Sequence, residues 1–291
     1  MNENSRADKI LPHPNPHRRL HLGIKDGELD GRPYAKFYNP NMPPLPEQAK
    51  EALLHGPVAA ALLPTLAAAP ALLAPGDSDL EDGFGLHPDG SLHVAIHTDM
   101  PHVSPAMIDW WFGWHSAEPE RYKLWHPRAH VHAQWSGADP PGKSGRERYV
   151  GRVSFVDEYV GSQLNRVAIE FLPPADLGLA GPALADPEQA TAVCARIWFA
   201  DQPVQIGYLV HHVRRTADGR GAKMRSRFWL GGPYASVRAF GVLAGLITRA
   251  MRRILRPSAR KGCELLVHCA QEMSHLATFL PALHSELHML H

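Results

Sequence analysis

His268-Cys-Ala-Gln-Glu-Met-Ser-His275 lies near the end of a chain of 291 residues. The surrounding residues have the apolar spacing of a helix, which predicts a mostly helical segment over 236–280 with a break near Pro257. Side chains four residues apart share one helix face, so His268 and Glu272 point the same way and His275 joins them. An imidazole and a carboxylate one turn apart can hold one divalent metal ion. The helix therefore predicts half of a metal site.

The chain ahead of this helix is typical of an antiparallel sheet. Its strand-like segments are 91–97, 128–135, 149–160, 165–172, 192–200, 204–215 and 223–230. A helix is expected from Ser104-Pro105, with serine as its cap, through Trp114. The order predicts an α+β fold in which the sheet curls around the long C-terminal helix and leaves a cavity between them.

Two domains are expected, a small, loop-rich one over 1–84 and a catalytic one over 85–291. The apolar run over 47–74 is interrupted by Gly56, Pro57, Pro64 and Pro70, which favours short helices over a membrane span.

Composition narrows the class of protein. Thirty basic and 29 acidic residues leave a net charge of +1, which indicates no general attraction to nucleic acid or membrane. Three cysteines without metal-site spacing, Cys194, Cys263 and Cys269, indicate free thiols in a reducing compartment. With a polar N-terminus, this predicts a cytoplasmic protein.

Two strand segments offer further ligands. Because side chains repeat every two residues, His130 and His132 are expected on one strand face. Asp157 and Glu158 are adjacent, so only one of them can point into the cavity. The His-Glu-x-x-His motif of zinc proteases and a second Glu-x-x-His copy are both absent from the chain.

Four motifs resemble the diacetylphloroglucinol hydrolase family, which includes phloretin hydrolase. They are Trp110-Trp-Phe-Gly-Trp-His115, Tyr122-Lys-Leu-Trp-His-Pro-Arg-Ala-His130, Ser226-Arg-Phe-Trp-Leu-Gly231 and His268-Cys-Ala-Gln-Glu272. The resemblance spans roughly residues 85–285. It implies a helix-grip fold of the Bet v 1 type, a homodimer, and one zinc ion per chain held by two histidines and two glutamates.

The resemblance also assigns roles to residues. The implied zinc ligands are His130, Glu158, His268 and Glu272. Tyr122 matches a substrate-contacting tyrosine, and His212 matches a cavity histidine. Two choices stay open, because His211 is adjacent to His212 and Asp157 is adjacent to Glu158. The side chains expected to hold the aromatic ring of the substrate are Trp111, Phe228 and Trp229.

The implied reaction is hydrolysis of the carbon–carbon bond between an acyl group and a polyhydroxylated aromatic ring. A metal-activated water would attack the acyl carbon, with His212 and Tyr122 transferring protons. The chain departs from the family pattern at two positions. The amide side chain expected soon after the strand histidine is found at Gln134, and Phe228 stands where a tyrosine is expected. Both changes move or remove a hydrogen-bond donor, so a different acylphenol is expected as substrate. The alternatives are a zinc hydrolase of esters or lactones, and a non-catalytic carrier of hydrophobic ligands.

Overall fold

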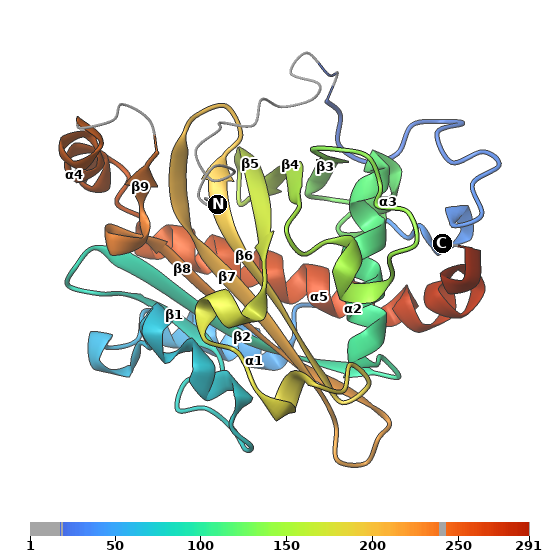
Figure 1. Cartoon of the computed structure of the whole chain (residues 1–291), viewed down its shortest axis with the longest axis horizontal. Helices are drawn as coiled ribbons and strands as arrows, with labels where there is room; N and C mark the ends of the chain where they lie inside the picture. Colours follow the sequence, from blue (N-terminus) through green and yellow to red (C-terminus); the bar gives the residue numbers. More distant parts are fainter. Residues whose placement is uncertain (1–17, 19, 239–242, 291) are drawn as a thin grey trace, which may run out of the picture.

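One antiparallel sheet wraps around the long C-terminal helix α5 (Ala259–Leu287) (Figure 1). The computed structural model describes Arg18, residues 20–238 and residues 243–290. The strands of these residues are β1 (Gly83–Leu86), β2 (Ser91–Pro101), β3 (His130–Trp135), β4 (Val153–Val160), β5 (Gln163–Leu172), β6 (Ala190–Phe199), β7 (Val204–Arg215), β8 (Gly221–Gly231) and β9 (Ser236–Val237). Their order is β1-β2-β8-β7-β6-β5-β4-β3, with β9 paired to β7.

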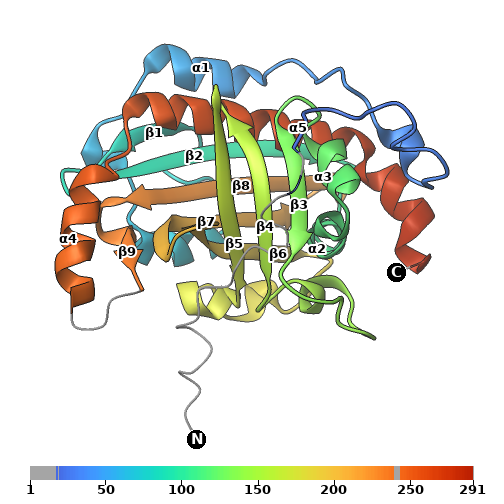
Figure 2. The same ribbon diagram turned by 90° about the horizontal axis from the view of Figure 1, so that it is seen from above.

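The sheet bends strongly between its two ends. Figure 2 shows β3, β4 and β5 crossing the direction of β2 and β8, so that the concave face closes on α5. The buried apolar face of α5 fills this concavity with Leu265, Leu266, Cys269, Met273, Leu276 and Leu280. The predicted α+β helix-grip fold is therefore confirmed.

Besides α5, the described residues form four shorter α-helices. They are α1 (Glu47–His55), α2 (Pro105–Trp114), α3 (Pro119–Trp125) and α4 (Ala244–Ile254). Ser104 caps α2 as expected, because its hydroxyl accepts a hydrogen bond from the Met107 amide at 3.3 Å. None of the described helices combines the length and apolarity that crossing a bilayer requires. All three cysteines are free thiols.

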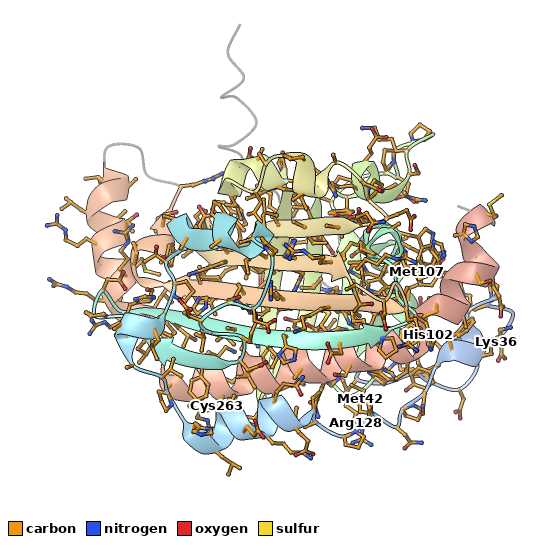
Figure 3. The ribbon with its side chains drawn as sticks, turned by 90° about the horizontal axis from the view of Figure 1, so that it is seen from below. Lys36, Met42, His102, Met107, Arg128 and Cys263 are labelled. Carbon is orange, nitrogen blue, oxygen red and sulfur yellow. The ribbon has the colours of Figure 1, made fainter. Side chains whose placement is uncertain are left out.

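The N-terminal part covers both the helix and the outer face of the sheet. The core around α5 also contains Tyr34, Ala49 and Ala52 from this part. Figure 3 shows Met42 and Arg128 close together below α5, where the Arg128 guanidinium donates to the Pro40 carbonyl at 3.2 Å. The boundary expected at residue 84 falls inside β1.

Ion pairs hold residues 77–81 against the outer face of β8. Arg225 lies 2.8 Å from a Glu81 carboxylate oxygen, and Arg227 lies 3.3 Å from the other oxygen. Lys223 pairs with Asp77 at 3.2 Å. Burial by itself would raise the pKa of Glu81, but the Ser78 amide and the two arginines lower that pKa to about 2.

We expect Glu81→Gln to lower the free energy of unfolding by about 2 kcal/mol at pH 7. Since the folded-state pKa lies below the ordinary value of 4.5, this contribution is complete above about pH 4.5 and disappears as the pH falls towards 2. Urea unfolding of both proteins at pH 7 and pH 3 measures the difference. Glu51→Gln, on an exposed position of α1, is the control. An equal gap between wild type and variant at both pH values would contradict the prediction.

Candidate active site

A cavity of about 130 Å³ lies between the sheet and α5. Its walls are mainly apolar and include Phe112, Trp125, Val156, Val167, Ile197, Leu209, Phe228 and Leu265. Its polar lining groups include Tyr122, Glu158, His211, His268 and Glu272. An apolar cavity with a few converging polar groups is typical of a small-molecule site.

The four predicted ligands lie together beside this cavity. The His130 Nε2 atom is 3.3 Å from a Glu272 oxygen and 3.7 Å from a Glu158 oxygen. The His268 Nε2 atom is 3.7 Å from each of the same two oxygens. Ligand atoms of His130, His268 and Glu272 lie within 4.8 Å of one another, close enough to share one metal ion.

A β-bulge brings the strand histidine to its glutamate. His130 pairs with Glu158, but His132 pairs with Asp157, so Val131 is an additional residue on β3. The bulge interrupts the alternation of side chains. His130 therefore joins the cavity cluster, whereas His132 lies near Arg18 and Asp157 on the other side. The expectation that His130 and His132 share one face was wrong, because it assumed an unbroken strand.

Adjacent acids on β4 have different partners. Glu158 lines the cavity, and Asp157 is fully buried on the opposite face. The Arg18 guanidinium donates to both Asp157 oxygens, at 2.6 Å and 2.5 Å. Asp157 therefore belongs to a buried ion pair with the N-terminal part, and Glu158 is the acid available to a ligand.

Exchanging each acid for its amide should separate these roles. We expect Asp157→Asn to lower the free energy of unfolding by about 3 kcal/mol, because Arg18 loses its buried counter-charge, while metal content is retained. Glu158→Gln should lower metal content and leave the stability of the metal-free protein within about 1 kcal/mol. Metal analysis and urea unfolding measure both effects. A metal loss in the Asp157 variant equal to that of the Glu158 variant would contradict the assignment.

The two adjacent histidines of β7 also face opposite ways. His211 lines the cavity, and its Nδ1 atom is 2.8 Å from the Ser226 hydroxyl. His212 pairs across the sheet with Arg225, whose guanidinium contacts Glu81 on the outer face. The prediction chose His212 for the cavity, and the structure places His211 there.

Of the three residues predicted to hold the substrate ring, one lines the cavity and two do not. Phe228 lines the cavity. Trp229 is on the outer face, where its indole N–H donates to the Pro64 carbonyl at 2.8 Å. Trp111 packs against Trp125 and Phe279 in the core and is not among the lining residues of the described cavity, which Phe112 from the same helix reaches instead. Trp111 and Trp229, which were expected to hold the ring, therefore do not line this cavity.

Comparison with known proteins identifies the family. The profile described as "DAPG hydrolase PhiG domain" matches residues 62–285. The chain is 31% identical over 268 residues to 2,4-diacetylphloroglucinol hydrolase of Pseudomonas protegens, covering 88% of this chain and 84% of the relative. The chain belongs to the DAPG hydrolase family. Phloretin hydrolase of Eubacterium ramulus is 28% identical over 258 residues, covering 87% of this chain and 89% of that protein. The expected resemblance and the expected hydrolase class are confirmed.

Solved structures with a related arrangement are distant. Ara h 8.0201 is 12% identical, with a TM-score of 0.32, and covers 62% of this chain and 99% of that chain. Major latex-like protein 151 of Panax ginseng is 11% identical, with a TM-score of 0.35, and covers 64% of this chain and 98% of that chain. At these scores the likeness has no bearing on ligand or activity.

A hydrogen bond sets the tautomer of His130 in this cluster. The Nδ1 atom of His130 lies 3.0 Å from the Tyr122 carbonyl, so it carries the proton and donates it. The Nε2 lone pair is then directed at two carboxylates, and this buried atom has no hydrogen-bond partner among the described residues. A carbonyl that orients the ring of a histidine in this way is common at metal sites.

Burial pushes each member of the cluster toward its neutral form. It raises the pKa of Glu272 and Glu158, and it lowers the pKa of His268 to about 4 and that of His130 well below its usual range. Neutral imidazoles therefore face carboxyl groups whose charge is costly without a partner. A bound cation would stabilise the carboxylates and use both imidazole lone pairs.

Lys261 and His115 also line the cavity, and neither was a predicted site residue. Residue spacing could have found Lys261, because it precedes His268 by seven positions and Glu272 by eleven on one helix face. The Nδ1 atom of His115 donates to the Trp111 carbonyl, and its Nε2 atom accepts from the Ser116 hydroxyl, both at 2.9 Å. No local pattern distinguished it from other buried histidines.

Proposed function

We propose that this member of the DAPG hydrolase family is a zinc-dependent hydrolase that cleaves the carbon–carbon bond between an acyl group and a polyhydroxylated aromatic ring. The observation that supports it is the cluster of two histidines and two glutamates beside an apolar cavity. The names of the relatives support substrates of the acylphloroglucinol class.

The cluster fits a divalent metal. His130, Glu158, His268 and Glu272 would hold it, since nitrogen and carboxylate oxygen are the ligands that zinc accepts. When bound, zinc would lower the pKa of a water and polarise the acyl carbonyl. The two carboxylates reduce the net charge at the ion, which weakens its effect on the pKa of a bound water. Positioning of the acyl oxygen by the protein would therefore contribute more to the reaction.

Tyr122 can hold or donate a proton beside the proposed metal ligands. Its hydroxyl donates to Glu158 in a short hydrogen bond, and its ring stacks on His130 with centroids 3.8 Å apart. Burial, followed by the charges of Glu158 and Glu272, raises its pKa well above the usual value, so the hydroxyl keeps its proton at neutral pH. Tyr122 can therefore orient Glu158 or donate to a phenolic oxygen of the substrate.

His211 takes the role first assigned to His212. Burial lowers the pKa of His211 to about 3, so the imidazole is neutral at pH 7. Because Ser226 occupies its Nδ1 atom, the other ring nitrogen remains for the substrate. In the hydrolysis, the acyl carbon gains the hydroxyl of water, and the ring carbon gains a proton as its bond to the acyl carbon breaks. A neutral imidazole near the ring can hold and pass on that proton.

Aromatic walls would hold the ring. Phe112, Trp125 and Phe228 line the cavity, and the offset or edge contacts that aromatic rings prefer are available to a phenolic substrate. Phe228 offers no hydrogen bond, so we expect acylphenols without a polar substituent toward β8 to be preferred.

A substrate panel on zinc-verified protein tests this function. Acylated phloroglucinols should release one carboxylic acid and the deacylated ring in equal amounts, as measured by chromatography of both products. Hydrolysis restricted to esters or lactones would identify the alternative zinc hydrolase. Binding of the same compounds without any product would identify a carrier.

We further propose that the enzyme is a cytoplasmic homodimer with one zinc ion per chain. Three free cysteines support a reducing compartment. Light scattering and metal analysis of the purified protein measure the mass and the zinc content.

A further inference from the structure

Helix α4 has a surface that the proposed reaction does not use. The helix stands at one edge of the molecule beside β9 (Figures 1 and 2). None of its residues is buried. Leu246 and Ile254 are 67% and 73% exposed, and the preceding Leu243 is 54% exposed. Single exposed apolar residues are ordinary, but these recur at helical spacing on one side of one helix.

The other side of α4 is basic and partly anchored. Arg252 donates to the carbonyls of Ala235 and Pro233, both at 2.9 Å, and the Thr248 hydroxyl accepts from the Val237 amide at 3.0 Å. These contacts fix the orientation of the helix. Three further arginines are left exposed next to the apolar residues: Arg249, Arg253 and, just after the helix, Arg256.

The charged residues in the sequence around α4 are all basic. Between Asp218 and Glu264 the chain contains no acidic residue. A net charge of +1 for the whole chain therefore conceals a local cationic surface. Its combination of arginines with protruding Leu and Ile is typical of helices that lie in a lipid interface.

We infer that α4 binds the surface of an anionic phospholipid bilayer. Leu246 and Ile254 would enter the boundary between headgroups and acyl chains, and the arginines would meet lipid phosphates. A symmetric contact between two copies centred on α4 is disfavoured, because it would bring the same arginines together without an acid to offset them. Nucleic acid would match the arginines but would leave the leucine and isoleucine in water.

The position of α4 relates this surface to the cavity. α4 lies at the same end of the molecule as the first turn of α5, where Lys261 lines the cavity (Figure 2). Leu230 at the end of β8 and Asn165 near the start of β5 line the cavity as well. Adsorption through α4 would bring this end of the cavity near the layer in which apolar acylphenols dissolve. This consequence rests on the proposed function, whereas lipid binding itself does not.

Vesicle co-sedimentation of the full chain tests the inference. We expect binding to vesicles of phosphatidylcholine and phosphatidylglycerol in equal parts at low salt, and little binding to phosphatidylcholine alone. Binding should weaken strongly at 0.5 M salt, where the screening length is only a few ångströms, roughly 4 Å. The combined variant Arg249→Gln, Arg253→Gln and Arg256→Gln should lower the partition coefficient about a hundredfold.

Two other variants make the test specific. Leu246→Gln with Ile254→Gln should lower binding about tenfold or more by removing apolar contacts with the lipid. A matched control, Lys50→Gln, Lys143→Gln and Arg220→Gln, removes three charges elsewhere and should retain most of the binding. Equal losses in control and α4 variants, or equal binding to both vesicle types, would overturn the inference.

Measurements of oligomeric state and of activity distinguish lipid binding from self-association and from the proposed reaction. A fall in mass by light scattering for Leu246→Gln with Ile254→Gln would show that α4 contacts another copy, which would also overturn the inference. In lipid-free buffer, hydrolysis of a water-soluble acylphenol should be the same for wild type and α4 variants. If the proposed function fails, hydrolysis is absent while anionic vesicles still bind the protein.

Discussion

Glu272→Ala should remove the metal and reduce hydrolysis by at least about a thousandfold. Glu272 supplies the oxygen that lies 3.3 Å from His130 and 3.7 Å from His268, so the variant leaves two imidazoles and one carboxylate around an enlarged space. A site that loses one of two charged ligands binds a divalent ion far less tightly. Elemental analysis after dialysis, together with the rate of carboxylic acid release, measures both effects.

The control for this variant is Glu264→Ala on the same helix. Glu264 pairs with Arg260 at 2.9 Å, two turns before Glu272, and is not part of the ligand cluster. It should retain about one zinc ion per chain and most of the activity. Full zinc content in the Glu272 variant would exclude the proposed ligand set. Zinc loss with unchanged hydrolysis would exclude a catalytic role for the ion.

His211→Asn should lower kcat by roughly a hundredfold to a thousandfold, with the metal retained. The imidazole lines the cavity, is neutral at pH 7 and has one nitrogen free for the substrate. Asparagine preserves a polar side chain of similar reach but cannot take up a proton. Single-turnover rates on zinc-loaded protein separate this loss from weaker substrate binding.

His212→Asn is the matched control one residue away. His212 is buried beside Arg225 on the outer face, so its replacement should change stability more than kcat. Burial and the neighbouring arginines lower its pKa to about 3, so no charged histidine is lost from that face at neutral pH. If His212→Asn reduced kcat more than His211→Asn, the assignment of the cavity histidine would be wrong.

Local spacing was sufficient for the helical half of the site. His268 and Glu272 share a face of any α-helix, whatever surrounds it, so their convergence could be predicted before the fold was known. The α+β fold was predictable for a similar reason, since strands and helix differ in apolar period. The family resemblance added His130 and Glu158. Their role as ligands stays a prediction, and the structure supports it by their proximity.

Strand positions were harder to predict because neighbouring residues face opposite ways. One residue of register decides whether His211 or His212, and Phe228 or Trp229, enters the cavity. The bulge at Val131 changes the alternation within β3 itself, and no residue pattern in this strand indicates it. The net charge of the whole chain was also a poor guide to its surface, because acidic residues elsewhere balance the basic residues around α4.

The sheet-and-helix plan, the family and the pairing of His268 with Glu272 could be predicted from the sequence, because each depends on local periodicity or on the spacing of motifs along the chain. Which side of each strand meets the cavity could be read only from the tertiary structure. It also showed that Asp157 is neutralised by Arg18, a partner 139 residues away, which leaves Glu158 for the ligand site. Contacts between distant segments depend on how the sheet closes, and that closure has no signature in any single stretch of residues.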